Sequence, residues 1–212
     1  MRALAVLCIA LGLAGTAGTA SAAFQGTVTR IPAGVREQMI GSSWHSGCPV
    51  PIRKLRLLTF NHWNFGGTAR QGRLIVHAYQ AQGILTVMRK LYRAHFPMRR
   101  VKLVDAYGGS DDRSMAANNT SAFNCRVVEG TSRWSQHAYG RAIDVNPVQN
   151  PYVSGSHVSP PAGERYVNRS QRLPGMIHRG DVVYRAFAAI GWEWGGDWTS
   201  PKDYQHFSLT GT

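Results

Sequence analysis

The sequence predicts an α+β fold in which a small antiparallel sheet is flanked by helices. Residues 55–63 and 72–78 are rich in strand-forming side chains and alternate in part between apolar and polar. Residues 80–96 then place apolar side chains at spacings of three and four, as on one face of a helix. Residues 99–107 alternate again. The resulting order of strand, strand, helix and strand favours α+β over an all-helical or all-β fold.

Local signals refine the first half of the chain. Residues 24–44 have no clear period, so we expect an irregular lead-in with a short helix over residues 33–39. The Gly66-Gly67 pair predicts a turn, and the short spacing makes the two strands around it neighbours. Pro97 ends the predicted helix.

The second half alternates long polar stretches with short regular elements. Residues 108–131 and 150–172 are predicted loops, and loops of such length are usually functional or cover a site. The remaining expectations are a loop entering a strand that ends near residue 144, a helix over 181–190 that Gly191 caps, a turn over 192–198 and a final strand over 204–209.

The first residues have the pattern of a signal peptide. A short basic start precedes an apolar run over residues 3–13, and Ala20-Ser21-Ala22 is an A-x-A cleavage site. The apolar run is too short to span a bilayer, which disfavours the alternative of a retained membrane anchor. We therefore expect residues 1–22 to be removed and residues 23–212 to form a single secreted domain, extracellular or bound to the cell wall, or periplasmic in a host with two membranes.

The chain is strongly basic, with a formal net charge of +13. Loss of Arg2 with the signal peptide lowers this value to +12. Such a balance suits a polyanion, and outside the cytoplasm the candidates are anionic wall polymers and lipid headgroups. We expect no nucleic-acid partner, because the basic residues are scattered and no nucleic-acid motif is present. A basic surface that only maintains solubility is the alternative.

The cysteine count predicts one disulfide. Cys8 leaves with the signal peptide, so Cys48 and Cys125 form an even pair in an oxidising compartment. The alternative is two free buried thiols. No Cys-His signature surrounds either residue, so a thiolate nucleophile is not expected.

Four side chains have the chemistry of a catalytic zinc centre. His137 and Asp144 are seven positions apart on a predicted loop and strand, and His206 lies on the final strand. Two imidazoles and one carboxylate leave room for a water ligand. Asp203, three residues before His206, is the candidate base for the proton of that water. Of the other histidines only His77, on a strand with apolar neighbours, is a spare candidate ligand.

The spacing of these residues resembles that of a known family. Ser135, His137, Gly140, Ala142 and Asp144 fit S-x-H-x-x-G-x-A-x-D, and Trp194-Gly-Gly-Asp-Trp198 precedes Asp203-Tyr-Gln-His206. Both motifs resemble those of the zinc peptidases that include VanY-like D-alanyl-D-alanine carboxypeptidases and L-alanyl-D-glutamate endopeptidases, the LAS-type enzymes. The resemblance extends from about residue 55 to residue 209.

The resemblance implies a hedgehog-like α+β fold with Zn²⁺ on a small antiparallel sheet. It implies His137, Asp144 and His206 as zinc ligands, Asp203 as the catalytic base and peptidoglycan stem peptides as substrates. Many relatives have Glu at the position of Asp203, although the endopeptidase-like branch commonly has Asp.

The sequence departs from the family pattern at the arginine that would stabilise the negatively charged carbonyl oxygen, the oxyanion, during hydrolysis. Relatives often carry a Tyr-Arg-Ser segment before the first motif, and here the candidates are Arg113 and Arg126, of which we prefer Arg126 because Cys125 would hold its backbone. We expect Ser135 and Trp198 to contact the substrate, although core packing is an alternative for the tryptophan. A wall-binding module with a structural zinc site remains the alternative function, and the peptide bond that is cut stays open.

Overall fold

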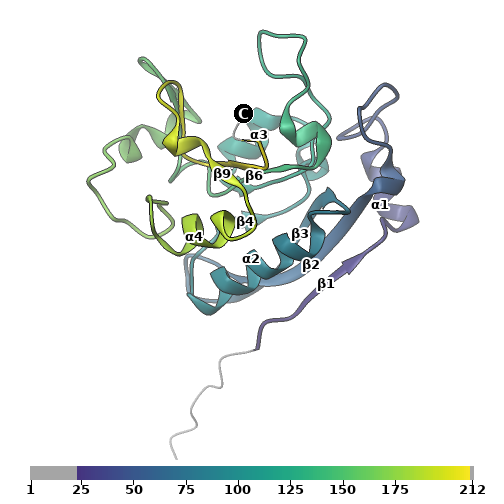
Figure 1. The fold of residues 1–212 in the computed structure, drawn as a ribbon, viewed down its shortest axis with the longest axis horizontal. Helices are drawn as coiled ribbons and strands as arrows, with labels where there is room; N and C mark the ends of the chain where they lie inside the picture. Colours follow the sequence, from purple (N-terminus) through teal and green to yellow (C-terminus); the bar gives the residue numbers. More distant parts are fainter. Residues whose placement is uncertain (1–22, 211–212) are drawn as a thin grey trace, which may run out of the picture.

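The structure, a computed structural model, describes residues 23–210 and confirms the α+β class (Figure 1). The α-helices are α1 (Ala33–Met39), α2 (Ala81–Arg93), α3 (Asp111–Ala116) and α4 (Val182–Ala188). The strands are β1 (Gly26–Thr29), β2 (Leu55–Trp63), β3 (Ala69–His77), β4 (Arg100–Val101), β5 (Asn119–Thr120), β6 (Ala142–Asp144), β7 (Tyr152–Ser154), β8 (His157–Ser159), β9 (Glu193–Trp194), β10 (Lys202–Asp203) and β11 (His206–Ser208). Short 3-10 helices are η1 (Ile52–Lys54), η2 (Val104–Tyr107), η3 (Gln136–Tyr139), η4 (Pro161–Tyr166) and η5 (Gly195–Asp197).

The largest sheet has the antiparallel order β1-β2-β3, and it confirms the two predicted strands as neighbours. β2 pairs with β3 along its full length, from Leu55 opposite His77 to Trp63 opposite Ala69. The sheet is buried on both faces, because Leu58 and Leu74 contact one hydrophobic cluster and Leu57 contacts a second. Burial on both faces explains why the sequence alternates only in part.

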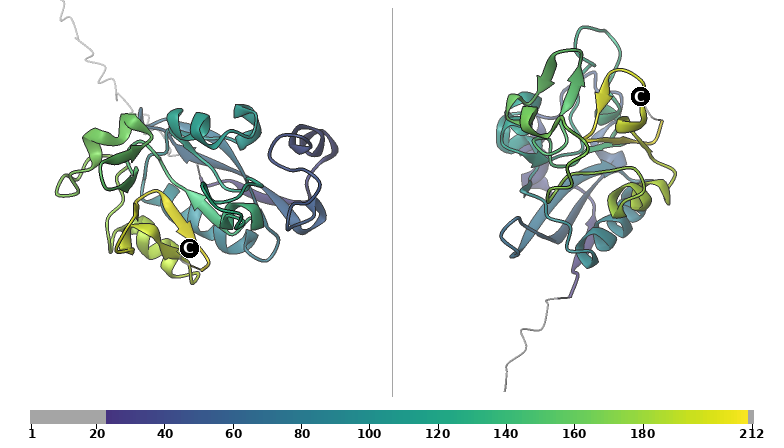
Figure 2. Two further views of the ribbon diagram at one scale, coloured as in Figure 1. Left: turned by 90° about the horizontal axis from the view of Figure 1, so that it is seen from above. Right: turned by 90° about the vertical axis from the view of Figure 1, so that its left-hand side faces the viewer.

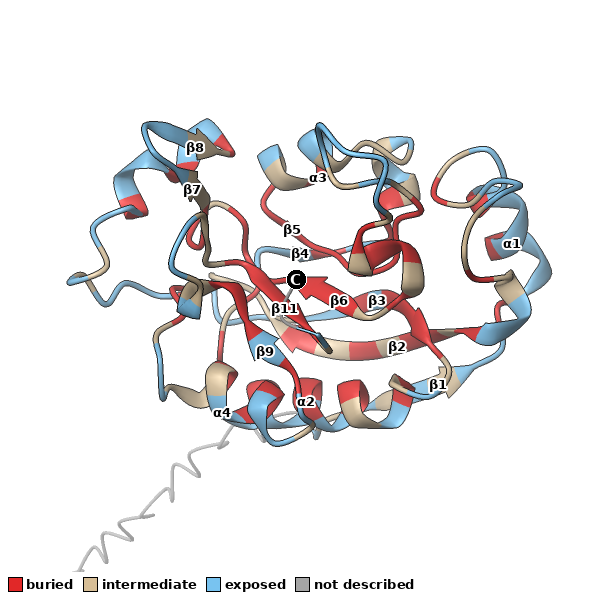
Figure 3. Cartoon of the chain, turned by 45° about the horizontal axis from the view of Figure 1, so that its top comes forward, coloured by how far each residue is buried: buried red, intermediate tan, exposed pale blue. Residues whose placement is uncertain are grey.

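Helices α2 and α4 pack together against the sheets along one side of the molecule (Figure 3). The predicted face of α2 is buried, with Ile84, Val87 and Leu91 fully enclosed. The helix ends at Arg93, four residues before Pro97. Gly191 follows α4 with a φ of +78°, as its predicted role at the helix end requires.

A second small sheet has the order β6-β11-β9. Successive side chains of a strand point to opposite faces. Phe207 of β11 lies on the helical side, where its ring stacks on Phe187 of α4 with centroids 4.1 Å apart. His206 and Asp144, which lie opposite each other in the β6–β11 register, therefore face away from the helices.

A third sheet, β10-β7-β8, lies where the sequence predicted only an irregular excursion. β7 and β8 form a hairpin at the end of the molecule opposite α1 (Figures 2 and 3). β7 also pairs with β10, which places Asp203 opposite Tyr152. The predicted loop over residues 150–172 is thus a support for the strand that carries the candidate base.

The predicted strand over residues 99–107 is wrong beyond Val101. The side chain of Asn119 takes the place of a partner strand: its Oδ1 accepts from the Lys102 N–H at 2.8 Å, and its Nδ2 donates to the Lys102 carbonyl at 3.0 Å. The chain then enters η2. Three other expectations also need correction. β1 lies in the irregular lead-in, α3 and β5 lie in the predicted loop over residues 108–131, and β9 lies in the predicted turn over residues 192–198.

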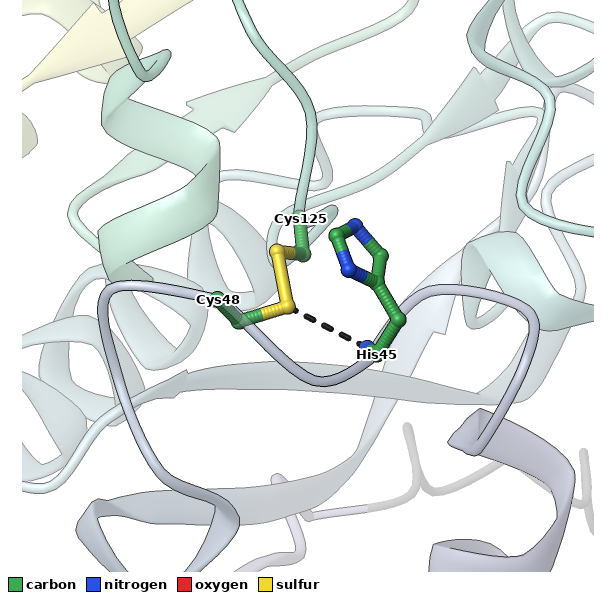
Figure 4. A group of neighbouring side chains, drawn as sticks. All are labelled: His45, Cys48 and Cys125. Atoms are coloured by element: carbon green, nitrogen blue, oxygen red, sulfur yellow. Dashed lines mark hydrogen bonds between the residues drawn. A yellow bond between two sulfur atoms is a disulfide. The ribbon is translucent and has the colours of Figure 1, made fainter.

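The predicted disulfide is confirmed. Cys48 and Cys125 are joined across a sequence separation of 77 residues (Figure 4). The bond connects the turn after α1 to the segment before η3, and the backbone N–H of His45 donates to Cys48 Sγ at 3.2 Å. His45 and the two cysteines form a cluster of metal-ligand types, but the sulfurs are committed to each other, so this cluster is no metal site.

Removing the disulfide is expected to lower the free energy of unfolding by about 4 kcal/mol or less, because the bond closes a long loop in the unfolded chain. The measurement is denaturant unfolding of the Cys48→Ala/Cys125→Ala protein beside wild type. Wild type in reducing buffer should approach the variant. Equal stability of all three samples would contradict the expectation.

The predicted signal peptide, residues 1–22, lies outside the described residues. Among the helices of residues 23–210, none has the length and apolar character needed to cross a membrane.

Candidate metal centre

Three side chains meet at the β6–β11 pair. His137 Nε2 lies 3.2 Å from Asp144 Oδ2, and His206 Nδ1 lies 3.0 Å from Asp144 Oδ1. The two ring nitrogens are 3.3 Å apart. All three residues are buried. The structure therefore brings together, at one point, the three ligands that the sequence predicted.

The turn that presents His137 is fixed by local contacts. Ser135 is the N-cap of η3, and its Oγ accepts from the backbone N–H of His137 at 3.3 Å. At the other end Gly140 has a φ of +65°, and a Cβ there would lie 2.6 Å from the backbone nitrogen of His77. Glycine is thus required for the close approach of η3 to β3. The structure gives Ser135 this capping role. Its predicted contact with substrate stays a prediction.

A backbone carbonyl sets the orientation of His137. Nδ1 lies 2.6 Å from the carbonyl oxygen of Ala122, which can only accept, so Nδ1 carries the proton. The lone pair of Nε2 then faces Asp144 and His206. Metal-binding histidines are typically oriented in this way by a second partner. The carbonyl of Ala122 is a part of the site that no motif indicated.

The three side chains are electrostatically coupled. Burial alone would raise the pKa of Asp144, but the charges and hydrogen bonds of His137 and His206 outweigh it and hold that pKa well below its usual range. Burial alone would lower the pKa of His137, and the Asp144 carboxylate reverses this and raises it. The two imidazoles that contact Asp144 therefore stabilise its buried carboxylate in the ionised form.

The donor set fits a zinc ion. Tetrahedral coordination with bonds of about 2.0–2.1 Å places neighbouring donor atoms about 3.3 Å apart, close to the separations found here. Two imidazole nitrogens and one carboxylate are ligands of catalytic zinc sites, and such a set of three leaves a coordination position open. Nδ1 is the donor atom of His206 that faces the other two residues, because it lies 3.0 Å from Asp144 Oδ1. The buried Nε2 of this ring has no hydrogen-bond partner within residues 23–210.

Asp203 lies beside the cluster on β10. Burial, together with the negative charge of Asp144, raises its pKa to about 6, against the opposing effects of His206, His137 and a hydrogen bond from Gln205. Its Oδ1 is enclosed and has no partner within residues 23–210. A carboxylate that is not a member of the three-residue cluster and has a raised pKa suits a proton acceptor.

Gly195 determines how closely η5 approaches Asp203. A Cβ on Gly195 would lie 2.6 Å from the Asp203 carbonyl oxygen and 2.9 Å from its Cβ. The sequence interpretation did not single out this residue, although the Trp194-Gly-Gly-Asp-Trp198 stretch contains the signal. The glycine lets the turn lie directly against the candidate base.

Gly195→Ala is expected to displace Asp203 and to reduce hydrolytic activity by about 100-fold, the effect of a displacement of about 1 Å at a catalytic group. Metal content should be unchanged, because the three ligands lie on other segments. The control is Gly34→Ala in α1, where a new Cβ meets nothing within 4 Å. Full activity of Gly195→Ala would mean that the turn moves without moving Asp203.

Arg126 is the better placed of the two candidate arginines. Its Nη2 lies 2.6 Å from Asp111 Oδ2, and its positive charge is among the influences that lower the pKa of His137. No such influence of Arg113 is found, and its guanidinium lies against Gly108. This electrostatic influence agrees with the predicted choice of Arg126, whose role at the oxyanion stays a prediction.

The remaining two predicted residues differ in position. The Trp198 ring lies 5.6 Å from that of His206, and its Nε1 is buried without a partner among the described residues. His77 is separate from the cluster, and its Nδ1 accepts from the backbone N–H of Tyr79 at 3.4 Å. The idea of His77 as a spare ligand therefore gains no support from the geometry.

Fold and site together define an α+β protein with a buried cluster of two histidines and one aspartate that could hold a metal ion. Residues 129–209 match the sequence profile of a peptidase family described as D-alanyl-D-alanine carboxypeptidase. The matched segment contains the three cluster residues and Asp203, and it confirms the predicted resemblance there. No curated protein and no solved structure gives a match.

Proposed function

We propose that this protein is a secreted zinc-dependent peptidase that hydrolyses stem peptides of peptidoglycan. The observation that carries the proposal is the buried cluster of His137, Asp144 and His206 with Asp203 beside it. The match of residues 129–209 to the D-alanyl-D-alanine carboxypeptidase family supports the same reaction class.

Each residue of the site has a defined task in this reaction. His137 Nε2, Asp144 and His206 Nδ1 would hold the ion, with the His137 ring fixed by the Ala122 carbonyl. A bound zinc ion supplies a Lewis acid and lowers the pKa of a coordinated water. Asp203, when ionised, accepts a proton from the attacking water and returns it to the nitrogen of the leaving amine. Burial of its Oδ1 limits the access of bulk water to this oxygen.

Arg126 would stabilise the negative charge that develops on the carbonyl oxygen. Arg126→Ala is expected to reduce kcat by about 10²–10³-fold, as the loss of one oxyanion donor does. Arg113→Ala should remain near wild type. Asp111→Asn separates this role from the ion pair: it removes the partner of Arg126 but keeps the guanidinium. If Asp111→Asn lowered kcat as much as Arg126→Ala does, Arg126 would contribute only through its ion pair with Asp111 and not as an oxyanion donor.

Secretion is supported by two independent features. The Cys48–Cys125 disulfide is typical of an oxidising compartment. The N-terminal sequence has the pattern of a signal peptide. Both fit a protein that meets its substrate in the cell wall or periplasm.

The test is digestion of purified peptidoglycan with the zinc-loaded protein, followed by mass analysis of the released fragments. Loss of a terminal D-alanine identifies a carboxypeptidase, and release of stem peptides cut after L-alanine identifies an endopeptidase. A chelator should abolish release and added Zn²⁺ should restore it. Zinc binding without release of any fragment would overturn the proposal.

That last outcome would favour a wall-binding module with a structural zinc site. The high net charge fits such a module equally well. The cluster argues against it, because structural zinc sites usually have four protein ligands and need no neighbouring base. Only three residues form the cluster within the described chain, and Asp203 is present.

A further inference from the structure

A cationic groove lies between α2 and α4, away from the metal-binding cluster. It has a volume of 420 Å³ and is lined by six residues: Lys90, Arg93, Ala94, Val182, Arg185 and Ala186. The three cations come from both helices and surround a floor of small apolar side chains. No carboxylate lines the groove.

The positive charge of this groove is not balanced locally. Neither helix contains an acidic residue, whereas exposed cations on helices are often paired with acids three or four positions away. Asp181, next to the groove, is already committed: its two carboxylate oxygens accept from the backbone N–H groups of His178 and Tyr184. Among the described residues, no ion pair involves Lys90, Arg93 or Arg185.

Helix electrostatics explain only part of the arrangement. Lys90 and Arg93 lie in the last turn of α2, where cations stabilise the carbonyl end of a helix. Arg185 is different, because its guanidinium donates to the carbonyl of Gly180, before the start of α4. This side chain is directed back along the helix, toward the end where a cation is unfavourable. Its position beside the two α2 cations therefore concentrates positive charge that no acidic side chain among the described residues pairs with.

We propose that this groove binds the phosphodiester groups of a polyol-phosphate polymer. Guanidinium groups match phosphate oxygens with two parallel hydrogen bonds, and a lysine adds a point charge. The small side chains of Ala94, Val182 and Ala186 leave room for the short polyol units that separate the phosphates. The groove is lined by no aromatic side chain, so it offers no platform for stacking nucleic-acid bases. It also presents no large apolar side chain for insertion among lipids.

The groove and the metal-binding cluster lie on different sides of the β6-β11-β9 sheet. Phe207 faces α4, while His206 faces away from it, so a polymer held at the helices leaves the cluster uncovered. Figure 3 shows α2 and α4 together on one side of β9 and β11. Binding at the groove is therefore independent of the proposed hydrolysis. It would retain the protein at a polymer-bearing surface without obstructing its site.

The experiment measures binding of a labelled oligomer of glycerol phosphate by fluorescence anisotropy. One variant carries Lys90→Gln, Arg93→Gln and Arg185→Gln. The matched control, Arg30→Gln, Arg36→Gln and Lys54→Gln, removes the same charge from the α1 end of the molecule. We expect the groove variant to lose at least about tenfold in affinity and to show a shallower salt dependence, with the control close to wild type. Circular dichroism and thermal melting establish that both variants are folded.

Several outcomes would overturn the proposal. Equal losses in both variants would show that net charge, rather than the groove, binds the oligomer. Inorganic phosphate could displace the labelled oligomer as well as unlabelled oligomer does at equal phosphate concentration. The groove would then be a site for a single phosphate ion and not for a polymer. Tighter groove-dependent binding to single-stranded DNA or to phosphatidylglycerol vesicles would assign a different partner. None of these measurements depends on peptidase activity, so the proposed function can fail while this inference stands.

Discussion

Asp203→Asn is expected to reduce kcat on a stem peptide by about 10²–10⁴-fold while the protein keeps its zinc. Asparagine has the shape of aspartate but cannot accept a proton at neutral pH, and general base catalysis contributes a factor of this size. Oδ1 of this carboxylate is buried beside the cluster and has no hydrogen-bond partner within residues 23–210. Zinc content by elemental analysis and kcat on the same preparation together provide the measurement.

The control for this variant is Asp197→Asn. Asp197 lies in η5, six residues earlier in the chain, but its carboxylate is paired with Arg179 at 2.8 Å on the surface. Its replacement should leave both zinc content and kcat nearly unchanged, since exposed ion pairs contribute little. If the Asp203→Asn protein retained most of its activity, Asp203 would not be the catalytic base. Loss of zinc in this variant would instead make Asp203 a ligand.

The pKa of Asp203 predicts how the activity falls at acid pH. Asp203 accepts a proton only when ionised, so activity must fall as the pH falls through its pKa. That pKa is raised to about 6 by burial, and a dication bound nearby lowers it. We therefore expect the acid limb of kcat/KM below about pH 6, measured at constant zinc occupancy. An acid limb well above that value would point to a different group.

Asp144→Asn is expected to weaken zinc binding by more than about 100-fold, beyond the effect of changing groups that only orient the ligands. Asp144 is the one carboxylate of the cluster and contacts both imidazoles. Its replacement by a neutral amide leaves the charge of the ion uncompensated in a buried site. Competition with a chelating dye measures the affinity, and activity should be lost in proportion to the bound metal.

His77→Gln is a matched control, because His77 is also a buried histidine but lies outside the cluster. Zinc affinity of this variant should equal that of wild type. If Asp144→Asn bound zinc normally, the cluster would be a hydrogen-bonded structural unit rather than a metal centre. If His77→Gln lost zinc, the ligand set would need to be revised.

The sequence could predict the parts of the fold that rest on local periodicity. α2 has apolar residues on one face over three turns, and the bounds of β2 agree with the predicted range. Apolar residues in these patterns must be buried whatever surrounds them. The four candidate site residues were predicted from their chemistry and from the resemblance of the two motifs to a zinc peptidase family, and the structure brings His137, Asp144 and His206 together.

Elements that depend on distant partners could not be predicted in this way. β7 and β8 are three residues long and pair with each other, and β7 also pairs with β10, about fifty positions later in the chain. Beyond Val101 the alternating stretch lacks a strand partner, because the amide of Asn119 occupies the hydrogen bonds of Lys102. A side chain that imitates a strand leaves no trace in periodicity. The role of the Ala122 carbonyl in orienting His137 could not be predicted either, because every residue has a backbone carbonyl.

The pairing of β6 with β11 has a consequence for biosynthesis. Asp144 and His206 lie directly opposite each other, yet 62 positions separate them in the chain. A ribosome completes β6, α4 and β9 before it makes β11, so a nascent chain that ends before β11 lacks one ligand and cannot form the centre. For the proposed zinc centre, metal capture therefore requires that β6 and β11 have already paired. A zinc titration of refolding protein would report how many molecules have completed the chain's final strand pairing.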